Sequence, residues 1–175
     1  MLDGKETAVV WFNGPSVRQF LDIPRQPLEI GCNFIEQHRA VHHVCAYDQD
    51  VIQRTVPRDQ VRYWTRKNMA TDLYHVVPSE VSYSCSGTMA VRLAVHLGAQ
   101  HVYVIGCDWE HTDSSVFDGQ YTWRYHAPKK FTNARRKTLE STCQEVSLTV
   151  VGDRRVPYAG VDTIKPGDFL RLINC

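Results

Sequence analysis

Apolar and β-branched residues form short runs along the chain, and each run ends abruptly in polar or turn-forming residues. The first run, residues 7–12, is closed by Asn13-Gly14-Pro15-Ser16. A strand that is buried on both faces has this appearance, and such strands are typical of parallel sheets. Similar runs predict further strands at residues 28–30, 41–47, 73–77, 102–105 and 146–151.

Helical patterns lie between these runs. Residues 88–97 have a strongly helical composition, Gly98 supplies a stop, and the run at 102–105 follows at once. A helix that leads directly into a strand gives the βαβ rhythm of a doubly wound sheet. Weaker helices are predicted at 17–21 with Ser16 as N-cap, within 50–69 before a break at Pro57, and at 133–143.

The whole chain, residues 1–175, is therefore predicted to be a single nucleotide-binding α/β domain with a Rossmann-like, mostly parallel, doubly wound sheet. Residues 109–130 are polar and aromatic without periodicity, which favours a short lid or loop. Residues 152–175 are predicted to be an irregular C-terminal tail with a short edge strand at 169–172.

Composition narrows the function classes. Hydrophobic residues make up 43% of the chain and charged residues 22%, and the net charge of +1 gives no long-range attraction to nucleic acid or anionic lipid. No apolar run is long enough for a membrane span and no secretory signal begins the chain, so a cytoplasmic protein is expected. The six cysteines form no Cys-x-x-Cys pair, which favours free thiols over disulfides or zinc. Adjacent strand residues point to opposite faces, so His42 and His43 cannot chelate one ion together.

Polar and small residues gather where the predicted strands end. In open parallel sheets the ligand binds beyond the carboxyl ends of the strands, and a helix N-terminus attracts phosphate. The predicted ligand is therefore a nucleotide or another phosphate-bearing small molecule. Its predicted binding residues are Asn13, Gly14, Pro15, Ser16, Asn33, Asp48, Ser86, Gly87 and Asp108.

The same residues form a recognisable pattern. Asn13-Gly14-Pro15-Ser16 follows the first strand, Cys32-Asn33 follows the second, and Ser86-Gly87 opens a helix that leads to the strand end Gly106-Cys107-Asp108-Trp109. From residue 7 to about residue 151 the chain resembles the bacterial CMP-sialic-acid-dependent sialyltransferases of glycosyltransferase family 42. The motility-accessory-factor proteins and the archaeal hydroxymethylpterin pyrophosphokinases share much of this pattern. A chain this small would suit a minimal bacterial or phage version.

The resemblance implies that Asn13, Gly14, Asn33 and the Ser86-Gly87 pair surround a CMP moiety. It also implies that a histidine of the lid, matched here by His126, is the general base. Nearby cations would offset the charge of the leaving phosphate. These cations are Arg124, Lys129, Lys130, Arg135 and Arg136.

The chain departs from the family at three places. Asp48 stands where the family has an Asn after the third strand, and a carboxylate suits a ribose hydroxyl or a metal ion. The two lid tyrosines near the leaving phosphate have no match in residues 110–116, although Tyr121 or Tyr125 could reach the same place. The lid is also shorter than in the family.

Three functions follow from this pattern. The leading one is a sialyltransferase-like glycosyltransferase with a CMP-type donor, without metal or other cofactor. The second is a Mg²⁺-dependent pyrophosphokinase of the hydroxymethylpterin type, in which Asp48 and Asp108 would bind the metal. The third is a nucleotide-binding protein without catalysis. No nucleic-acid partner is expected, and self-association into a homo-oligomer is compatible with the small size.

Overall fold

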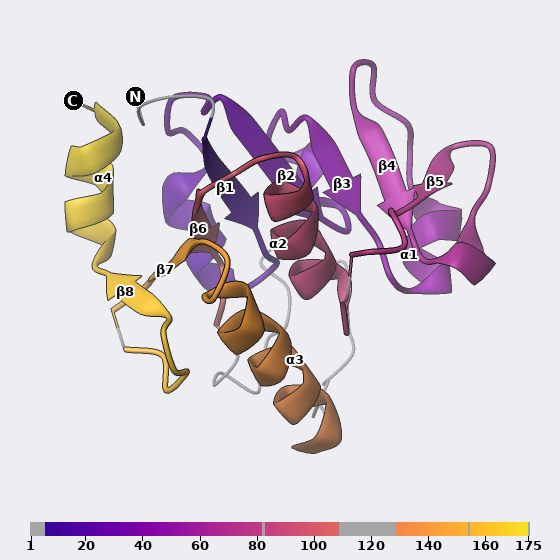
Figure 1. Cartoon of the computed structure of the whole chain (residues 1–175). Coiled ribbons are helices and arrows are strands. Elements are labelled where there is room, and N and C mark those ends of the chain that lie inside the picture. The colour runs from indigo at the N-terminus through magenta and orange to yellow at the C-terminus, as the bar shows by residue number, and fades with distance from the viewer. Residues whose placement is uncertain (1–5, 82, 109–128, 154, 175) are drawn as a thin grey trace.

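The computed structural model describes residues 6–81, 83–108, 129–153 and 155–174, with the backbone alone at residues 129–132. Eight strands form one sheet in the order β5-β4-β3-β2-β1-β6-β7-β8, and every neighbouring pair is parallel (Figure 1). The strands are β1 Thr7–Trp11, β2 Leu28–Cys32, β3 His43–Cys45, β4 Arg62–Thr65, β5 Tyr74–Val76, β6 His101–Ile105, β7 Ser147–Val151 and β8 Asp162–Ile164.

The strand order reverses once. The chain adds β2, β3, β4 and β5 outward from β1, and α2 then carries it back so that β6 pairs with β1 on the other side. The predicted Rossmann-like, doubly wound α/β fold is confirmed. The order reverses between β1 and β6, and sheets of this kind bind ligands beyond the carboxyl ends of the strands at such a point.

Helices cover both faces of the sheet. Helices α2 and α3 pack on one face and lie side by side in Figure 1, whereas α1, α4 and the 3-10 helices η1 and η2 contribute to the core on the other face. The helical segments are η1 Pro15–Phe20, η2 Ile35–Gln37, α1 Gln49–Arg54, η3 Lys67–Met69, α2 Ser86–His96, α3 Lys129–Thr142 and α4 Pro166–Asn174. Among the helices described, none has the length and apolar character needed to cross a membrane.

Strand β1 shows why its apolar run is continuous. Val9 and Trp11 pack into the core on one face of the sheet, and Ala8 and Val10 pack into the core on the other. All four side chains have no exposed surface. Because successive strand residues point to opposite faces, a strand covered on both sides needs an apolar residue at every position.

The structure differs from the sequence prediction at three places. Residues 62–65, predicted as part of a polar helix and loop, form strand β4, and residues 169–172, predicted as an edge strand, lie within helix α4. The C-terminal tail is therefore not irregular, since β8 and α4 occupy much of it. The predicted N-cap Ser16 lies inside η1, whose N-cap is Gly14.

A buried ion pair lies at the amino-terminal side of β2. The Glu29 carboxylate has no exposed surface, and it accepts two hydrogen bonds from the Arg39 guanidinium, Nε to Oε2 at 2.7 Å and a terminal nitrogen to Oε1 at 2.6 Å. Trp11 Nε1 donates to the same carboxylate at 3.1 Å, and its ring lies 4.4 Å below the guanidinium carbon. Arg39 also donates to the carbonyl oxygens of Leu21 and Ile23. The pair thereby ties the segment after η1 to β2.

Replacing Arg39 by leucine should destabilise the protein strongly. The substitution leaves the Glu29 carboxylate buried without its cation, which typically costs about 3–5 kcal/mol. Urea unfolding followed by circular dichroism would measure the loss. The double variant Glu29→Leu/Arg39→Leu should recover much of the stability, and equal losses in the single and double variants would contradict this account.

Candidate functional site at the carboxyl edge of the sheet

The predicted ligand residues that the structure describes lie along one edge of the sheet. They follow the carboxyl ends of β1, β2, β3 and β6 or open helix α2, so the topology brings segments far apart in the sequence to neighbouring positions. This edge includes the carboxyl ends of β1 and β6, where the strand order reverses. The role of these residues in ligand binding remains a prediction.

The turns after β1 and β6 are bonded directly to each other. The Phe12 amide donates to the Ile105 carbonyl at 2.8 Å, and the Gly14 amide donates to the Gly106 carbonyl at 3.0 Å. Gly106 has φ +77°, a conformation that favours glycine. The pairing of β1 with β6 thus continues past the ends of both strands.

Asp108 holds the first turn of η1 in place. Its Oδ2 accepts a hydrogen bond from the Ser16 amide at 2.8 Å, so a carboxylate from the β6 loop binds the amino end of a helix in the β1 loop. Carboxylates stabilise helix amino ends in this way. The sequence predicts Asp108 as a ligand residue, and this structural role was missed because it depends on a contact across 92 residues.

Two of the predicted ligand glycines have neighbours in the protein that explain their small size. A Cβ added to Gly14 would lie 2.2 Å from Asp108 Oδ2 and 2.4 Å from the Gly106 carbonyl oxygen. A Cβ added to Gly87 would lie 2.6 Å from the Phe12 ring. These glycines allow the β1 loop to pack against the β6 loop and against α2.

Ser86 connects helix α2 to the loop after β3. It is the first residue of α2, and its Oγ accepts a hydrogen bond from the Tyr47 amide at 2.9 Å. The hydroxyl can donate its own hydrogen to a ligand at the same time. The N-cap is Cys85, and Thr88 Oγ1 accepts from the Cys85 amide at 3.1 Å, which fixes the first turn. The first amides of α2 and its dipole then face this edge with positive charge.

Two polar side-chain atoms in the loops after β1 and β2 have hydrogen-bonding capacity that the described residues leave unused. Ser16 Oγ and Asn33 Oδ1 are both buried, and neither has a hydrogen-bond partner in the part of the chain that the structure describes. Asn33 has φ +54°, and its amide donates to the Cys45 carbonyl at 3.0 Å, so the residue is fixed between β2 and β3. Buried polar groups in proteins are almost always bonded, which makes these two atoms candidates for ligand contacts.

Asp48 is placed among charged groups. Desolvation of its carboxyl and the neighbouring Asp50 raise the pKa of Asp48, whereas Arg66 and Arg135 act in the opposite direction. Arg66 directly follows β4, and Arg135 lies on α3. Sequence reasoning missed Arg66 at this edge because it did not detect β4, whose carboxyl end places that residue.

Two cysteines at this edge are poor nucleophiles. Cys32, Cys45, Cys85, Cys107 and Cys143 are free thiols, as predicted. Burial is the main cause that raises the pKa of Cys32 and of Cys107 well above the usual range. Because the thiolate is the reactive form, these two thiols are unsuited to nucleophilic catalysis at neutral pH.

The predicted base and lid lie outside the described residues. His126 and Arg124 belong to the segment 109–128, and the side chains of Lys129 and Lys130 are likewise not described. Arg136 donates to Glu140 at 2.8 Å on the exposed face of α3.

No group of three or more histidine, cysteine or acidic residues in the described ranges could hold a metal ion. His42 and His43 have separate partners, the Glu29 amide and Trp64 Nε1.

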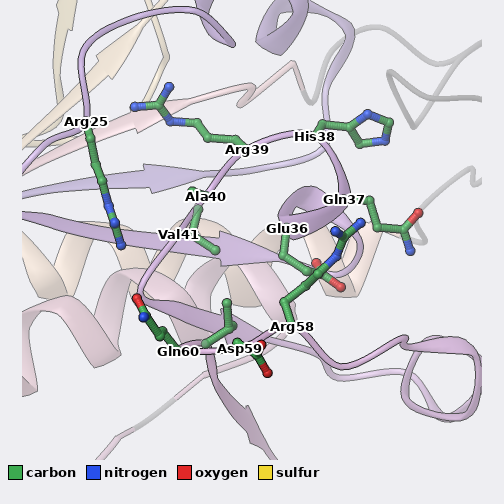
Figure 2. Close-up of a pocket in the computed structure, with 11 residues that line it drawn as sticks. Arg25, Glu36, Gln37, His38, Arg39, Ala40, Val41, Arg58, Asp59 and Gln60 are labelled. Carbon is green, nitrogen blue, oxygen red and sulfur yellow. The ribbon is translucent and has the colours of Figure 1, made fainter.

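A surface hollow of about 510 Å³ lies elsewhere in the molecule. Figure 2 shows its lining side chains, which come from Arg25, from residues 36–41 and from residues 58–61. These segments lead into β2, β3 and β4, so the hollow lies toward the amino ends of the strands. None of the predicted ligand residues lines this hollow, and neither does the amino end of α2.

The close packing of the β1 and β6 loops can be tested at Gly14. Its φ of −69° and ψ of 156° suit any residue, so Gly14→Ala adds only a steric conflict with Asp108 and Gly106. Overpacking of this kind costs about 1–3 kcal/mol, measurable as a lower unfolding free energy in urea. Gly152→Ala is the matched control, since nothing lies within 4 Å of its added Cβ. Equal stability of the two variants would contradict the packing described here.

Comparison with known proteins gives one likeness in fold. No family model matches the sequence, and no curated protein matches it. Among solved structures, the crystal structure of the sialyltransferase CST-II in complex with a trisaccharide acceptor and CMP superimposes with a TM-score of 0.52. The match covers 82% of this chain and 80% of that chain at 14% sequence identity. This chain therefore shares its fold with a sialyltransferase, which agrees with the resemblance found in the sequence.

Proposed function

We propose that this protein is a glycosyltransferase that uses a nucleotide-activated sugar donor of the CMP type. The observation that supports this most is the pair of buried polar atoms with unused bonding capacity, Ser16 Oγ and Asn33 Oδ1, at the carboxyl edge of the sheet. They lie at the ends of β1 and β2, beside the point where the strand order reverses. The fold shared with a sialyltransferase crystallised with CMP supports the same proposal.

Each of the site residues would bind a different part of the nucleotide. The amino end of α2, with the amides of Ser86 and Gly87, would bind the phosphate. Ser16 Oγ can donate a hydrogen bond, so it suits a phosphate or ribose oxygen. Asn33 Oδ1 can only accept, so it suits a ribose hydroxyl or the amino group of cytosine. Asp48 would accept from a second ribose hydroxyl.

In the proposed reaction His126 removes the proton from an acceptor hydroxyl. The acceptor oxygen then forms a bond to the anomeric carbon of the donor sugar, and the bond between that carbon and the phosphate oxygen breaks. CMP leaves with the bonding electron pair. Arg124, Lys129 and Lys130 on the chain around His126 would offset the charge that develops on the phosphate.

A thermal-shift screen tests the nucleotide site. CMP should raise the melting temperature without Mg²⁺, because a ligand that binds only the folded state stabilises it, by about 2.7 kcal/mol at a hundred times its Kd. UDP, GDP, ADP and ATP serve as comparisons. Stabilisation by ATP only with Mg²⁺ would instead indicate the pyrophosphokinase function, and the absence of any shift would contradict the nucleotide site.

The role of His126 is tested by separating binding from transfer. His126→Ala should lower the rate of sugar transfer by about 100- to 10,000-fold, the usual contribution of a general base, and leave the Kd for CMP unchanged. His96→Ala, changed at an exposed position on α2, is the control. Tight CMP binding with no transfer by the unmodified protein to any glycan acceptor would indicate a binding protein without catalysis.

A further inference from the structure

The Arg66 side chain adds a cationic group to the same edge of the sheet, two strands away from β2. Arg66 directly follows β4, and its guanidinium carbon lies 4.5 Å from the centre of the Tyr47 ring in the loop after β3. The Tyr83 ring packs beside Tyr47, and the two ring centres are 6.1 Å apart in a T-shaped arrangement. A cation stacked on an aromatic face is held in a defined orientation.

The Arg66 platform, defined as Arg66, Tyr47 and Tyr83, is joined to the proposed nucleotide site. The Tyr47 amide donates to Ser86 Oγ at 2.9 Å, so one residue contacts both the guanidinium and the first residue of α2. A ligand with its phosphate at the amino end of α2 could therefore reach Arg66.

The hydrogen-bonding groups of Arg66 are not consumed by the described part of the protein. Its Nε is buried and has no hydrogen-bond partner among the described residues, and no described carboxylate forms an ion pair with it. A half-buried guanidinium held on an aromatic ring, with its planar fork of donors free, matches the geometry of a carboxylate or phosphate group.

A second arginine acts on the same carboxyl group as Arg66. Arg66 and Arg135 both act to lower the pKa of Asp48, and Arg135 also acts to lower that of Cys107 after β6. The two arginines thus offset the charge of Asp48 and Asp50, and the amino end of α2 carries the positive end of its own dipole.

We propose that Arg66 binds a second anionic group of the ligand, a carboxylate or phosphate distinct from the phosphate at the amino end of α2. This rests on the proposed function, because it places the second anion on the same bound molecule. It implies a substrate that carries two negative centres, either an acidic sugar joined to a nucleoside monophosphate or a nucleotide with a further phosphate. Tyr47 is the positioning residue that holds the guanidinium.

The test compares ligands that differ in anionic groups. Isothermal titration would measure Kd for cytidine, CMP, CTP and a CMP-linked acidic sugar with the unmodified protein and with Arg66→Gln. Loss of a charge-assisted hydrogen bond should weaken binding of the ligand with two anionic groups by roughly 10- to 100-fold, while cytidine binding changes less than about twofold. Loss for CTP alone would identify a phosphate, and loss for the sugar nucleotide alone would identify a carboxylate.

Matched variants separate this role from general effects. Arg62→Gln removes the same charge from an exposed position on β4, the strand that Arg66 follows, and should leave every Kd unchanged. Arg66→Lys keeps the charge but loses the planar fork, so it should restore binding only in part. An equal loss in Arg62→Gln, an equal loss for cytidine, or unchanged binding by Arg66→Gln would each overturn the proposal.

Inorganic phosphate distinguishes this proposal from the proposed function. If the protein binds no nucleotide but is stabilised by millimolar phosphate in an Arg66-dependent way, the nucleotide function fails and the anion site stands. If CMP binds and phosphate-bearing ligands are indifferent to Arg66, the anion site fails and the nucleotide site stands. The absence of both effects overturns both.

Discussion

The close approach of the loops after β1 and β6 is the constraint on which the rest of this edge depends. Gly14 and Gly106 bring the two backbones within hydrogen-bonding distance, and Asp108 fixes the amino end of η1 from the neighbouring loop. Any side chain at Gly14 would occupy the position of the Asp108 carboxylate. At the point where the strand order reverses, the two loops are thus bonded directly to each other.

This packing determines which polar groups remain for a ligand. Asp108 and the Ser16 amide satisfy each other, and Ser86 Oγ is bonded to Tyr47, yet Ser16 Oγ and Asn33 Oδ1 have no partner in the described ranges. The groups left open for a ligand therefore include the Ser16 hydroxyl, which can donate, and the Asn33 amide oxygen, which can accept. The positive amino end of α2 lies at the same edge. That combination suits a nucleotide better than a metal or a peptide.

The sequence alone predicted the central strands and α2 because each has an unbroken apolar or helical pattern set by burial on two faces. It failed for β4 and α4. Strand β4 carries Arg62 and Trp64 on a partly exposed face, so its apolar pattern is weak. Helix α4 buries Phe169 and Ile173, which are four positions apart, but the short apolar run at 169–172 is also compatible with an edge strand. For the candidate site, the polar residues in the turns after the strands were recognised from the sequence. The Asp108–Ser16 bond and the position of Arg66 were not, because they depend on contacts between distant segments.

The central claim is that the ligand binds at the carboxyl edge of the sheet. Amide NMR of the ¹⁵N-labelled protein titrated with CMP tests it most directly, because shift changes map the binding surface. The account predicts the largest changes at the amides of Ser16, Asn33, Tyr47 and Gly87. Changes confined to Arg25, to residues 36–41 and to residues 58–61 would place the ligand in the hollow at the opposite edge and contradict the account.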